Sequence, residues 1–326
     1  MSLKNIRKEV MLTLEKNIDQ FVDKFLIPAE KIWQPTDFLP NSQKDSFITE
    51  VEEIRALSKD LEDDFWVVLV GDTITEEALP TYESWLLDID GIHQNPDNGW
   101  AKWVRTWTAE ENRRGDVLNK YLYLSGRVNM REVEISTQHL ITDGFDLGTS
   151  SDAYKSFVYT SFQELATYIS HNNVAKIARE KGHKALAKMS RIIAGDEMRH
   201  HQAYSKFVKE IFSIDPSEMM IAFQQMMQHK IIMPAMHLRE SFGAKGGLFG
   251  DFSAVTQRLG VYTGFDYVDI LKKLNTIWEI DKITNLTPEA EKARDYLMHL
   301  PDRMYRITER IVIPNTKFEF KWMLPA

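Results

Sequence analysis

The chain contains no cysteine and little glycine or proline. The lack of cysteine excludes disulfides, zinc ribbons, iron–sulfur clusters and thiol nucleophiles, and it fits a reducing compartment such as the cytoplasm. Only 15 glycines and 11 prolines occur among 326 residues, which leaves room for long uninterrupted helices. No apolar run is long enough to cross a bilayer, and the start of the chain lacks the apolar core of a signal peptide. We therefore expect a soluble, cytoplasmic protein that does not associate with membranes.

Positive charge is outweighed by negative charge, and the net charge of −8 argues against nucleic acid as a partner. Helical periodicity runs to about residue 310 without a linker, so we predict one all-α domain over residues 1–326. The tail from Thr316 to Met323 alternates apolar and polar residues, which predicts a small C-terminal β-hairpin with residues 311–314. Eleven helices are expected, at residues 3–26, 42–60, 63–90, 100–127, 129–143, 151–180, 182–212, 215–232, 250–260, 264–278 and 286–310.

Two helical segments each carry a glutamate with a basic residue three positions later: Glu197 with His200, and Glu111 with Arg114. Residues at this spacing share a helix face, so Glu197 and His200 can reach the same metal. Carboxylate oxygens together with imidazole suit iron or manganese. A single Glu-x-x-His is also common on a solvated helix face, so the motif needs support from its surroundings.

Two lone glutamates provide that support, because both lie in apolar helical segments. Glu76 precedes Glu111 by 35 residues, and Glu164 precedes Glu197 by 33 residues. Buried glutamates are rarely tolerated without a partner or a metal. Two Glu-x-x-His elements and two lone glutamates form the ligand set of a di-iron centre in a helix bundle, and this chain has five of the six ligands. By contrast, His171 is expected to be structural.

Six sequence blocks resemble those of one family, in that family's order and across nearly the whole chain. Together they are similar to the soluble acyl-[acyl carrier protein] desaturases, the stearoyl-carrier-protein desaturase family. The blocks are Trp33–Pro40, Val67–Tyr82, Trp107–Met130, Tyr159–Glu164, Asp196–His200 and Phe252–Thr263.

The resemblance implies a ferritin-like bundle of about eleven helices that forms a homodimer. It implies a centre of two irons, reduced by a ferredoxin-type electron donor, that activates O2. That centre would remove two hydrogens from a saturated acyl chain carried on acyl carrier protein and leave a cis double bond. Chain length and double-bond position depend on the shape of the acyl channel, which residue identities alone do not give.

The family's metal ligands carry over by position. Glu76 and Glu164 would be terminal carboxylates, and Glu111 and Glu197 would bridge the irons. His200 would bind the second iron.

Three further residues match positions around the centre. Thr167 matches a threonine near the oxygen-binding face. Trp107 and Asp196 match residues on the proposed route of the electrons.

The chain departs from the family at Arg114, which stands where the first iron's histidine is expected. An arginine side chain has no lone pair to offer a metal, and its permanent charge repels a nearby cation. We therefore expect weak or absent metal at the first position. Because Asp196 would orient the missing histidine in the family, we expect it to form a buried ion pair with Arg114 instead.

A local excess of positive charge lies between Glu164 and Glu197 in the chain. It is suited to docking acidic acyl carrier protein or ferredoxin, although a solvated helix–loop–helix surface would have the same composition. The residues are Lys176, Arg179, Lys181, Lys184, Lys188 and Arg191.

Three functions therefore stay open at this point. The first is an active or Arg114-altered acyl-[acyl carrier protein] desaturase, an oxidoreductase of fatty acid biosynthesis. The second is a non-catalytic homologue that binds acyl chains or a partner. The third is an oxidase or peroxidase with a one-iron site. Two irons per chain would favour the first, one iron the third, and none the second.

Overall fold

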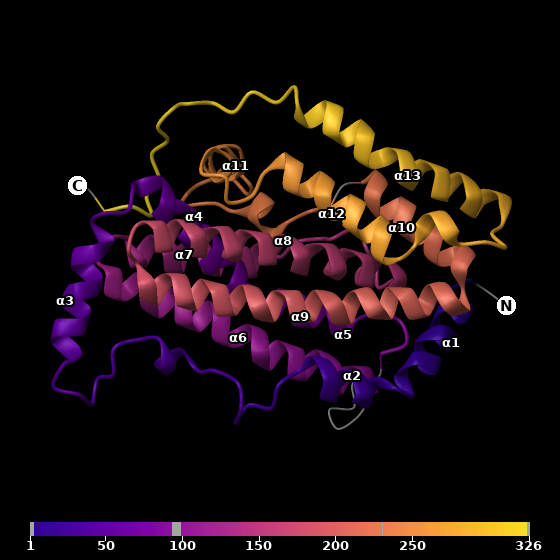
Figure 1. Cartoon of the computed structure of the whole chain (residues 1–326), viewed down its shortest axis with the longest axis horizontal. Helices are drawn as coiled ribbons and strands as arrows, with labels where there is room; N and C mark the ends of the chain where they lie inside the picture. Colours follow the sequence, from indigo (N-terminus) through magenta and orange to yellow (C-terminus); the bar gives the residue numbers. More distant parts are fainter. Residues whose placement is uncertain (1–2, 93–98, 230, 325–326) are drawn as a thin grey trace.

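The computed structural model describes residues 3–92, 99–229 and 231–324 of the chain. Within these ranges the fold is an elongated bundle of α-helices (Figure 1). Two long antiparallel helices, α8 (Ala153–Glu180) and α9 (Lys184–Ile214), run side by side through its middle. They pack with α4 (Asp63–Glu77) and α6 (Gly99–Ser125), and these four helices carry every expected metal ligand.

The other helices cover the two sides of this central group (Figure 1). On one side lie α1 (Leu3–Glu15), α2 (Ile18–Phe25) and α3 (Phe47–Ser58). The opposite side is covered by α10 (Pro216–Gln228), α11 (Phe249–Arg258), α12 (Gly264–Ile277) and α13 (Pro288–Thr308). The remaining two helices are α5 (Leu79–Leu87) and α7 (Met130–Asp143).

The core is continuous and rich in aromatic side chains. Helix α4 is apolar on nearly all sides, from Phe65 to Ile74, because it lies between other helices rather than against water. Trp100 and Trp103 of α6 pack on Phe207 of α9, with ring centroids 5.0 Å apart in both pairs. This packing fixes α6 against α9 next to the positions that carry Glu111 and His200. No helix of the described residues is both long and apolar enough to span a membrane.

The described residues form thirteen α-helices rather than eleven, because two expected helices are broken. The expected helix 3–26 is interrupted between α1 and α2 at Lys16 and Asn17. The expected helix 63–90 ends at Glu77, and α5 begins one residue beyond Ala78 with Pro80 in its first turn. Proline fits a first turn, where its missing N–H has no helical partner, but it does not fit a helix interior.

The predicted C-terminal β-hairpin is wrong. In the described parts of the chain no strand forms, and the tail makes only an isolated antiparallel bridge between Val128 and Met323. Its alternating pattern has another cause, because the extended tail lies along the helices and turns every second side chain inward. Phe320 and Trp322 are buried there and stack with ring centroids 5.6 Å apart, whereas Lys321 between them is exposed.

One hydrogen bond anchors this tail. The indole Nε1 of the fully buried Trp322 donates to Ser136 Oγ on α7 at 2.8 Å. In a Ser136→Ala variant the buried N–H loses its acceptor, which should lower the free energy of unfolding by about 1–3 kcal/mol. Urea denaturation measures this loss, with the exposed Ser213→Ala as a control that stays within about 0.5 kcal/mol of the parent. Equal stability of the two variants would contradict the anchor.

Candidate metal centre

The five expected ligands converge on one buried pocket between α4, α6, α8 and α9. Glu111, Glu164, Glu197 and His200 are buried, and the Glu76 side chain is 8% exposed. Each lies at a helix position that faces the neighbouring central helices, so the pocket is a consequence of the four-helix packing. Their convergence agrees with the sequence prediction, although the structure itself assigns them no role.

One group of donor atoms comes from Glu111, Glu164 and His200. His200 Nδ1 lies 2.7 Å from Glu111 Oε1 and 3.8 Å from Glu164 Oε2. The other ring nitrogen, Nε2, lies 2.9 Å from Glu110 Oε2. A carboxylate behind a histidine is the usual way to orient an imidazole toward a metal. The sequence did not single out Glu110, because its position next to Glu111 gives no distinct signal.

Trp107 and Thr167, two of the three further residues expected around the centre, lie on the helices that carry Glu111 and Glu164. Trp107 Nε1 donates a hydrogen bond to Glu164 Oε1 at 3.1 Å, which holds one carboxylate oxygen and leaves the other without a hydrogen-bond partner. Thr167 lies one turn after Glu164, and its hydroxyl donates to backbone carbonyls of its own helix.

A second group comes from Glu76, Glu197 and His171. The expectation that His171 is structural overlooked its place in the pocket, where Nε2 lies 3.0 Å from Glu76 Oε1. A spacing signal was present in the sequence, since His171 follows Glu164 by seven residues and so shares its helix face. The neighbouring His201 points elsewhere, with Nδ1 2.8 Å from the Ser161 carbonyl oxygen.

The guanidinium of Arg114 lies inside this pocket and is fully buried. Nη1 contacts a carboxylate oxygen of Glu111 and lies 2.9 Å from Glu197 Oε1. Nη2 lies 2.8 Å from His200 Nδ1. The arginine thus connects the two carboxylates that the family resemblance assigns as bridges.

The predicted ion pair between Arg114 and Asp196 is wrong. Asp196 accepts hydrogen bonds from Trp33 Nε1 at 2.8 Å and from Arg199 Nη2 at 2.7 Å. Arg114 instead turns toward the glutamates of the pocket. Several buried carboxylates attract the guanidinium more strongly than one aspartate that already has two closer donors.

The donor set fits a metal ion by its unsatisfied groups. Oε2 of Glu197 and Oε2 of Glu164 lack hydrogen-bond partners among the described residues, although both side chains are 1% exposed, and Oε1 of Glu197 has only the ion pair with Arg114. Leaving buried carboxylate oxygens unpaired is costly, and a bound cation is the usual compensation. Glutamate oxygens and imidazole nitrogens, without thiolate, suit iron or manganese.

The carboxyl groups bind protons unusually tightly when no metal is present. Burial raises the pKa of Glu76 and Glu197 from the ordinary 4.5 to about 7, although the nearby Arg114 charge opposes the shift. Burial and the neighbouring Glu111 and Glu197 raise the pKa of Glu164 as well. Metal binding must displace these protons, so affinity for metal should rise with pH.

The same shifts predict how the stability of the metal-free protein depends on pH. A carboxyl group whose pKa is higher in the folded state stabilises the fold below about pH 4.5 and loses that contribution as pH rises to about 7. Metal-free protein should therefore unfold at a lower denaturant concentration at pH 8 than at pH 5.5. Added Fe(II) should reverse this loss at pH 8. A metal-free protein that is more stable at pH 8 would contradict the assignment.

An apolar cavity of about 480 Å³ reaches this pocket from the surface. At its inner end lie Glu76, Glu111, Trp107 and Thr167. At the outer end it is lined by residues of α13 such as Ile307, which is half exposed. The walls between are mostly apolar. The remaining lining includes Leu79, Tyr82, Ile231, Met233, Phe252, Tyr267 and Met304.

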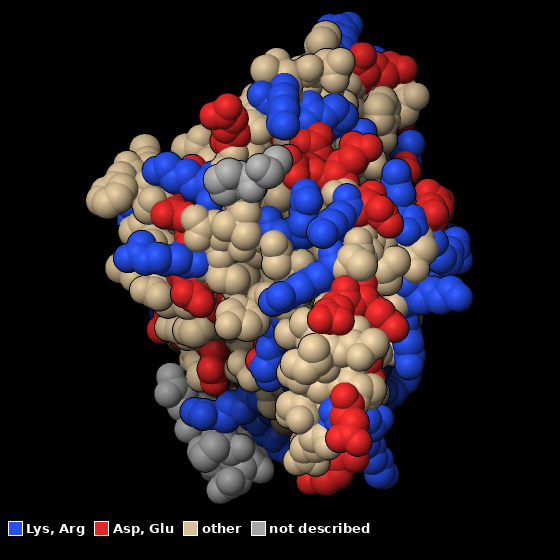
Figure 2. Space-filling model, turned by 90° about the vertical axis from the view of Figure 1, so that its left-hand side faces the viewer, with Lys and Arg blue, Asp and Glu red and all other residues tan. Residues whose placement is uncertain are grey.

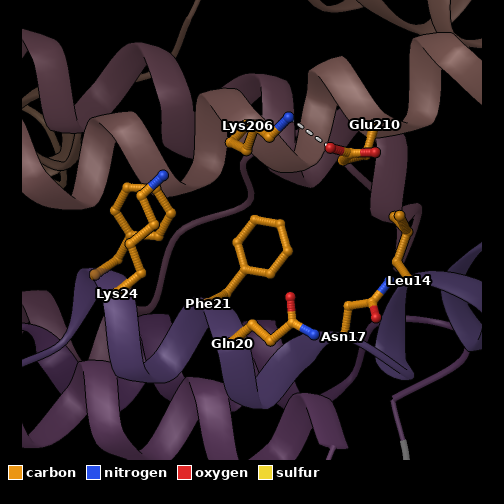
Figure 3. Close-up of a pocket in the computed structure, with 8 residues that line it drawn as sticks. Leu14, Asn17, Gln20, Phe21, Lys24, Lys206 and Glu210 are labelled. Carbon is orange, nitrogen blue, oxygen red and sulfur yellow. Dashed lines mark ion pairs between the residues drawn. The ribbon is translucent and has the colours of Figure 1, made fainter.

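A smaller hollow of about 270 Å³ lies between α2 and α9, away from the expected ligands (Figure 3). Polar and charged side chains line it, including Lys206 and Glu210, which form an ion pair at 2.6 Å. None of the predicted site residues lines it, so we assign it no role in the chemistry.

The six basic residues from Lys176 to Arg191 lie around the turn between α8 and α9 and are all exposed. Within the described ranges, none of the six forms an ion pair with a carboxylate. Figure 2 views this end of the molecule and shows lysine and arginine side chains gathered on it, with acidic side chains among them. The structure thus leaves their charge available to a partner without showing one.

Fold and pocket together define a helix-bundle protein with a buried carboxylate–histidine cluster of the kind that holds metal ions. A family model described as fatty acid desaturase matches residues 6–324. The chain therefore belongs to the fatty acid desaturase family.

Individual relatives agree with this family. The chain is 50% identical over 305 residues to the chloroplastic stearoyl-[acyl-carrier-protein] 9-desaturase of Ricinus communis. The matched region covers 93% of this chain and 76% of that protein. It is 48% identical to stearoyl-[acyl-carrier-protein] 9-desaturase 1 of Arabidopsis thaliana, with 93% and 77% covered. The X-ray structure of DesA2 from Mycobacterium tuberculosis H37Rv has a TM-score of 0.53 at 18% identity, covering 89% of this chain and 99% of that one. This likeness shows a shared fold.

Proposed function

We propose that this protein introduces a double bond into a saturated acyl chain carried on acyl carrier protein, using iron held by the carboxylate–histidine pocket. The observation that carries the proposal is the apolar cavity, because it is lined at its inner end by Glu76, Glu111 and Thr167 and would bring an acyl chain to them. Its volume lies within the range of about 300–1,000 Å³ typical of small-molecule sites.

The reaction balances with an external electron donor. Two hydrogen atoms leave adjacent carbons of the acyl chain, and O2 is reduced to two waters with two further electrons and two protons. Bound iron would supply the power to reduce O2 and oxidise unactivated C–H bonds. We propose a ferredoxin-type protein as the electron donor and a homodimer as the assembly.

The chain's own residues position the substrate and keep water out. The apolar walls around Leu79, Phe252 and Met304 hold the acyl chain in an extended channel and exclude solvent from its inner end. Trp107 holds Glu164 in place through its indole N–H. Thr167 lies at the inner end of the cavity, where its side chain would face the bound acyl chain. Asp196, held by Trp33 and Arg199, links this region to the protein surface as a route for electrons.

Arg114 affects how many irons we expect the pocket to hold and how tightly each is bound. Its guanidinium adds a positive charge among four glutamates and contacts both carboxylates expected to bridge two irons. We propose that one iron binds tightly at Glu111, Glu164 and His200, and that metal at the first position is weaker.

The direct test uses protein loaded anaerobically with Fe(II). Stearoyl-[acyl carrier protein] is the first substrate to offer, with reduced ferredoxin and O2, and the acyl product is analysed by gas chromatography and mass spectrometry. We expect a monounsaturated acyl chain. Iron-loaded protein that makes no unsaturated product from stearoyl-[acyl carrier protein] or from shorter saturated acyl chains on the same carrier would refute the activity. Ferredoxin oxidation without such a product would favour the one-iron oxidase instead.

We further propose that the basic residues around the α8–α9 turn dock acyl carrier protein. A Lys184→Glu, Lys188→Glu double variant should raise KM for the acyl-carrier substrate by about tenfold while kcat changes little, because rim charges act mainly on association. The effect should shrink at high salt. A Lys8→Glu, Lys16→Glu double variant at α1 is the control, since it makes the same change of charge at a different surface. Equal KM values for the double variant and the parent would exclude this surface.

A further inference from the structure

Three donor atoms meet at a place where the family's ligand pattern does not predict a complete set. One donor atom each from Glu76 of α4, His171 of α8 and Glu197 of α9 lies within 4.8 Å of the other two. His171 Nε2 is 3.0 Å from the glutamate on α4 and 3.9 Å from the glutamate on α9. The resemblance assigns both glutamates to the metal centre, but it assigns the histidine no role.

The spacing of these atoms matches the spacing in the other group. There, His200 Nδ1 lies 2.7 Å and 3.8 Å from the oxygens of Glu111 and Glu164. Two donor atoms that each bind a metal at about 2.0–2.2 Å are separated by no more than about 4.4 Å. Both groups of one histidine and two glutamates therefore have the reach to hold an ion.

The protein leaves two atoms of the group of Glu76, His171 and Glu197 without partners. Glu197 is almost fully buried; its Oε1 lies 2.9 Å from Arg114 Nη1, and its Oε2 accepts no hydrogen bond from the described residues. His171 is 1% exposed, and its Nδ1 also lacks a partner there. A buried carboxylate oxygen without a partner, beside an imidazole with one unpartnered nitrogen, is an arrangement that a cation would satisfy.

Arg114 explains why a histidine from another helix is needed. Its guanidinium contacts Glu111 from one group and Glu197 from the other, so it separates the two groups instead of completing one. The imidazole that position 114 lacks is present across the pocket on α8, two turns beyond Glu164.

We propose that His171 is the histidine ligand of the first metal position, together with Glu76 and Glu197. This inference rests on the proposed function, because it adds a residue to the same metal centre. Each position then has one imidazole and two carboxylates, and the guanidinium stands between the positions. Four carboxylates, one guanidinium and two divalent ions carry a net charge of +1, so the second ion binds more weakly than the first.

His171→Gln is the informative variant. The glutamine amide N–H can replace the imidazole as a donor to Glu76, but it cannot replace the imidazole nitrogen as a metal ligand. His183→Asn is the control, because His183 is a buried histidine of the chain outside both groups. Each protein is titrated with Co(II) and examined by absorption and by proton NMR for hyperfine-shifted, exchangeable imidazole N–H signals.

The parent and His183→Asn should bind two Co(II) per chain, the second more weakly, and show two such signals. His171→Gln should lose one signal and weaken the second binding step by at least about 100-fold. Loss of a residue that only hydrogen-bonds to a ligand typically lowers metal affinity by about 10–100-fold, so a ligand should have an effect at or above the top of that range. Two unchanged binding steps in His171→Gln, or a single step in the parent, would overturn the role of His171 and leave the proposed function intact. A parent that binds no metal would overturn both.

Discussion

Replacing Arg114 with histidine is expected to raise the affinity for the weaker metal ion by at least about 100-fold. The change removes a permanent positive charge from the pocket and adds a nitrogen donor at the place that the family pattern assigns to the first iron. Two unit charges 4 Å apart interact with about 4 kcal/mol at an effective dielectric constant of 20, and about 1.4 kcal/mol corresponds to a tenfold change. Relieving a divalent ion of only part of this repulsion is therefore enough to raise its affinity by the expected 100-fold.

The measurement is iron per chain after equilibration with a low, fixed concentration of Fe(II). The parent should retain about one iron and Arg114→His nearly two, the numbers that the single tight site and the weaker second site predict. Arg105→His places a new histidine on an exposed face of the same helix and is the matched control. Unchanged iron in Arg114→His would show that this residue does not limit metal binding.

Replacing Arg114 with methionine is expected to destabilise the metal-free protein by about 3–5 kcal/mol. Methionine keeps much of the side chain's length but removes the charge that Glu111 and Glu197 face. Breaking a buried pair by removing one partner has a cost of this size, because the other charge stays buried without compensation. The loss should be larger at pH 8 than at pH 5.5, where protonation relieves the carboxyl groups.

Added Fe(II) should restore most of the stability of Arg114→Met, since a bound cation takes over the role of the guanidinium. Arg105→Met serves as the control and should stay within about 0.5 kcal/mol of the parent. Urea denaturation with and without metal measures both effects. A metal-free Arg114→Met protein as stable as its parent would mean that the guanidinium is not needed to balance the buried charge.

Most of the helices were predictable, because long amphipathic or apolar segments leave a clear periodic pattern. The breaks at Asn17 and Ala78 were harder, since the pattern continues across both. The tail misled because an extended segment lying on a helical core has the same alternation as a strand. Phe320 and Trp322 turn inward without any partner strand.

The candidate site was predictable in its glutamates and in His200, whose spacing and family pattern agree with their convergence. The absence of a ligand at Arg114 was also visible in the sequence, but the direction of its side chain was not. That direction depends on which buried charges lie nearby after four separate helices have packed. His171 was expected to be structural, because seven-residue spacing is common on any helix and becomes informative only with Glu76 and Glu197 in place.

Anomalous X-ray diffraction from crystals equilibrated with Fe(II) under anaerobic conditions tests the central claim most directly. The account predicts a strong iron peak bounded by Glu111, Glu164 and His200, and a weaker peak beside Glu76, His171 and Glu197 at higher metal concentration. Iron found only on the protein surface, with the glutamates of the pocket paired solely with Arg114 and with protons, would contradict it.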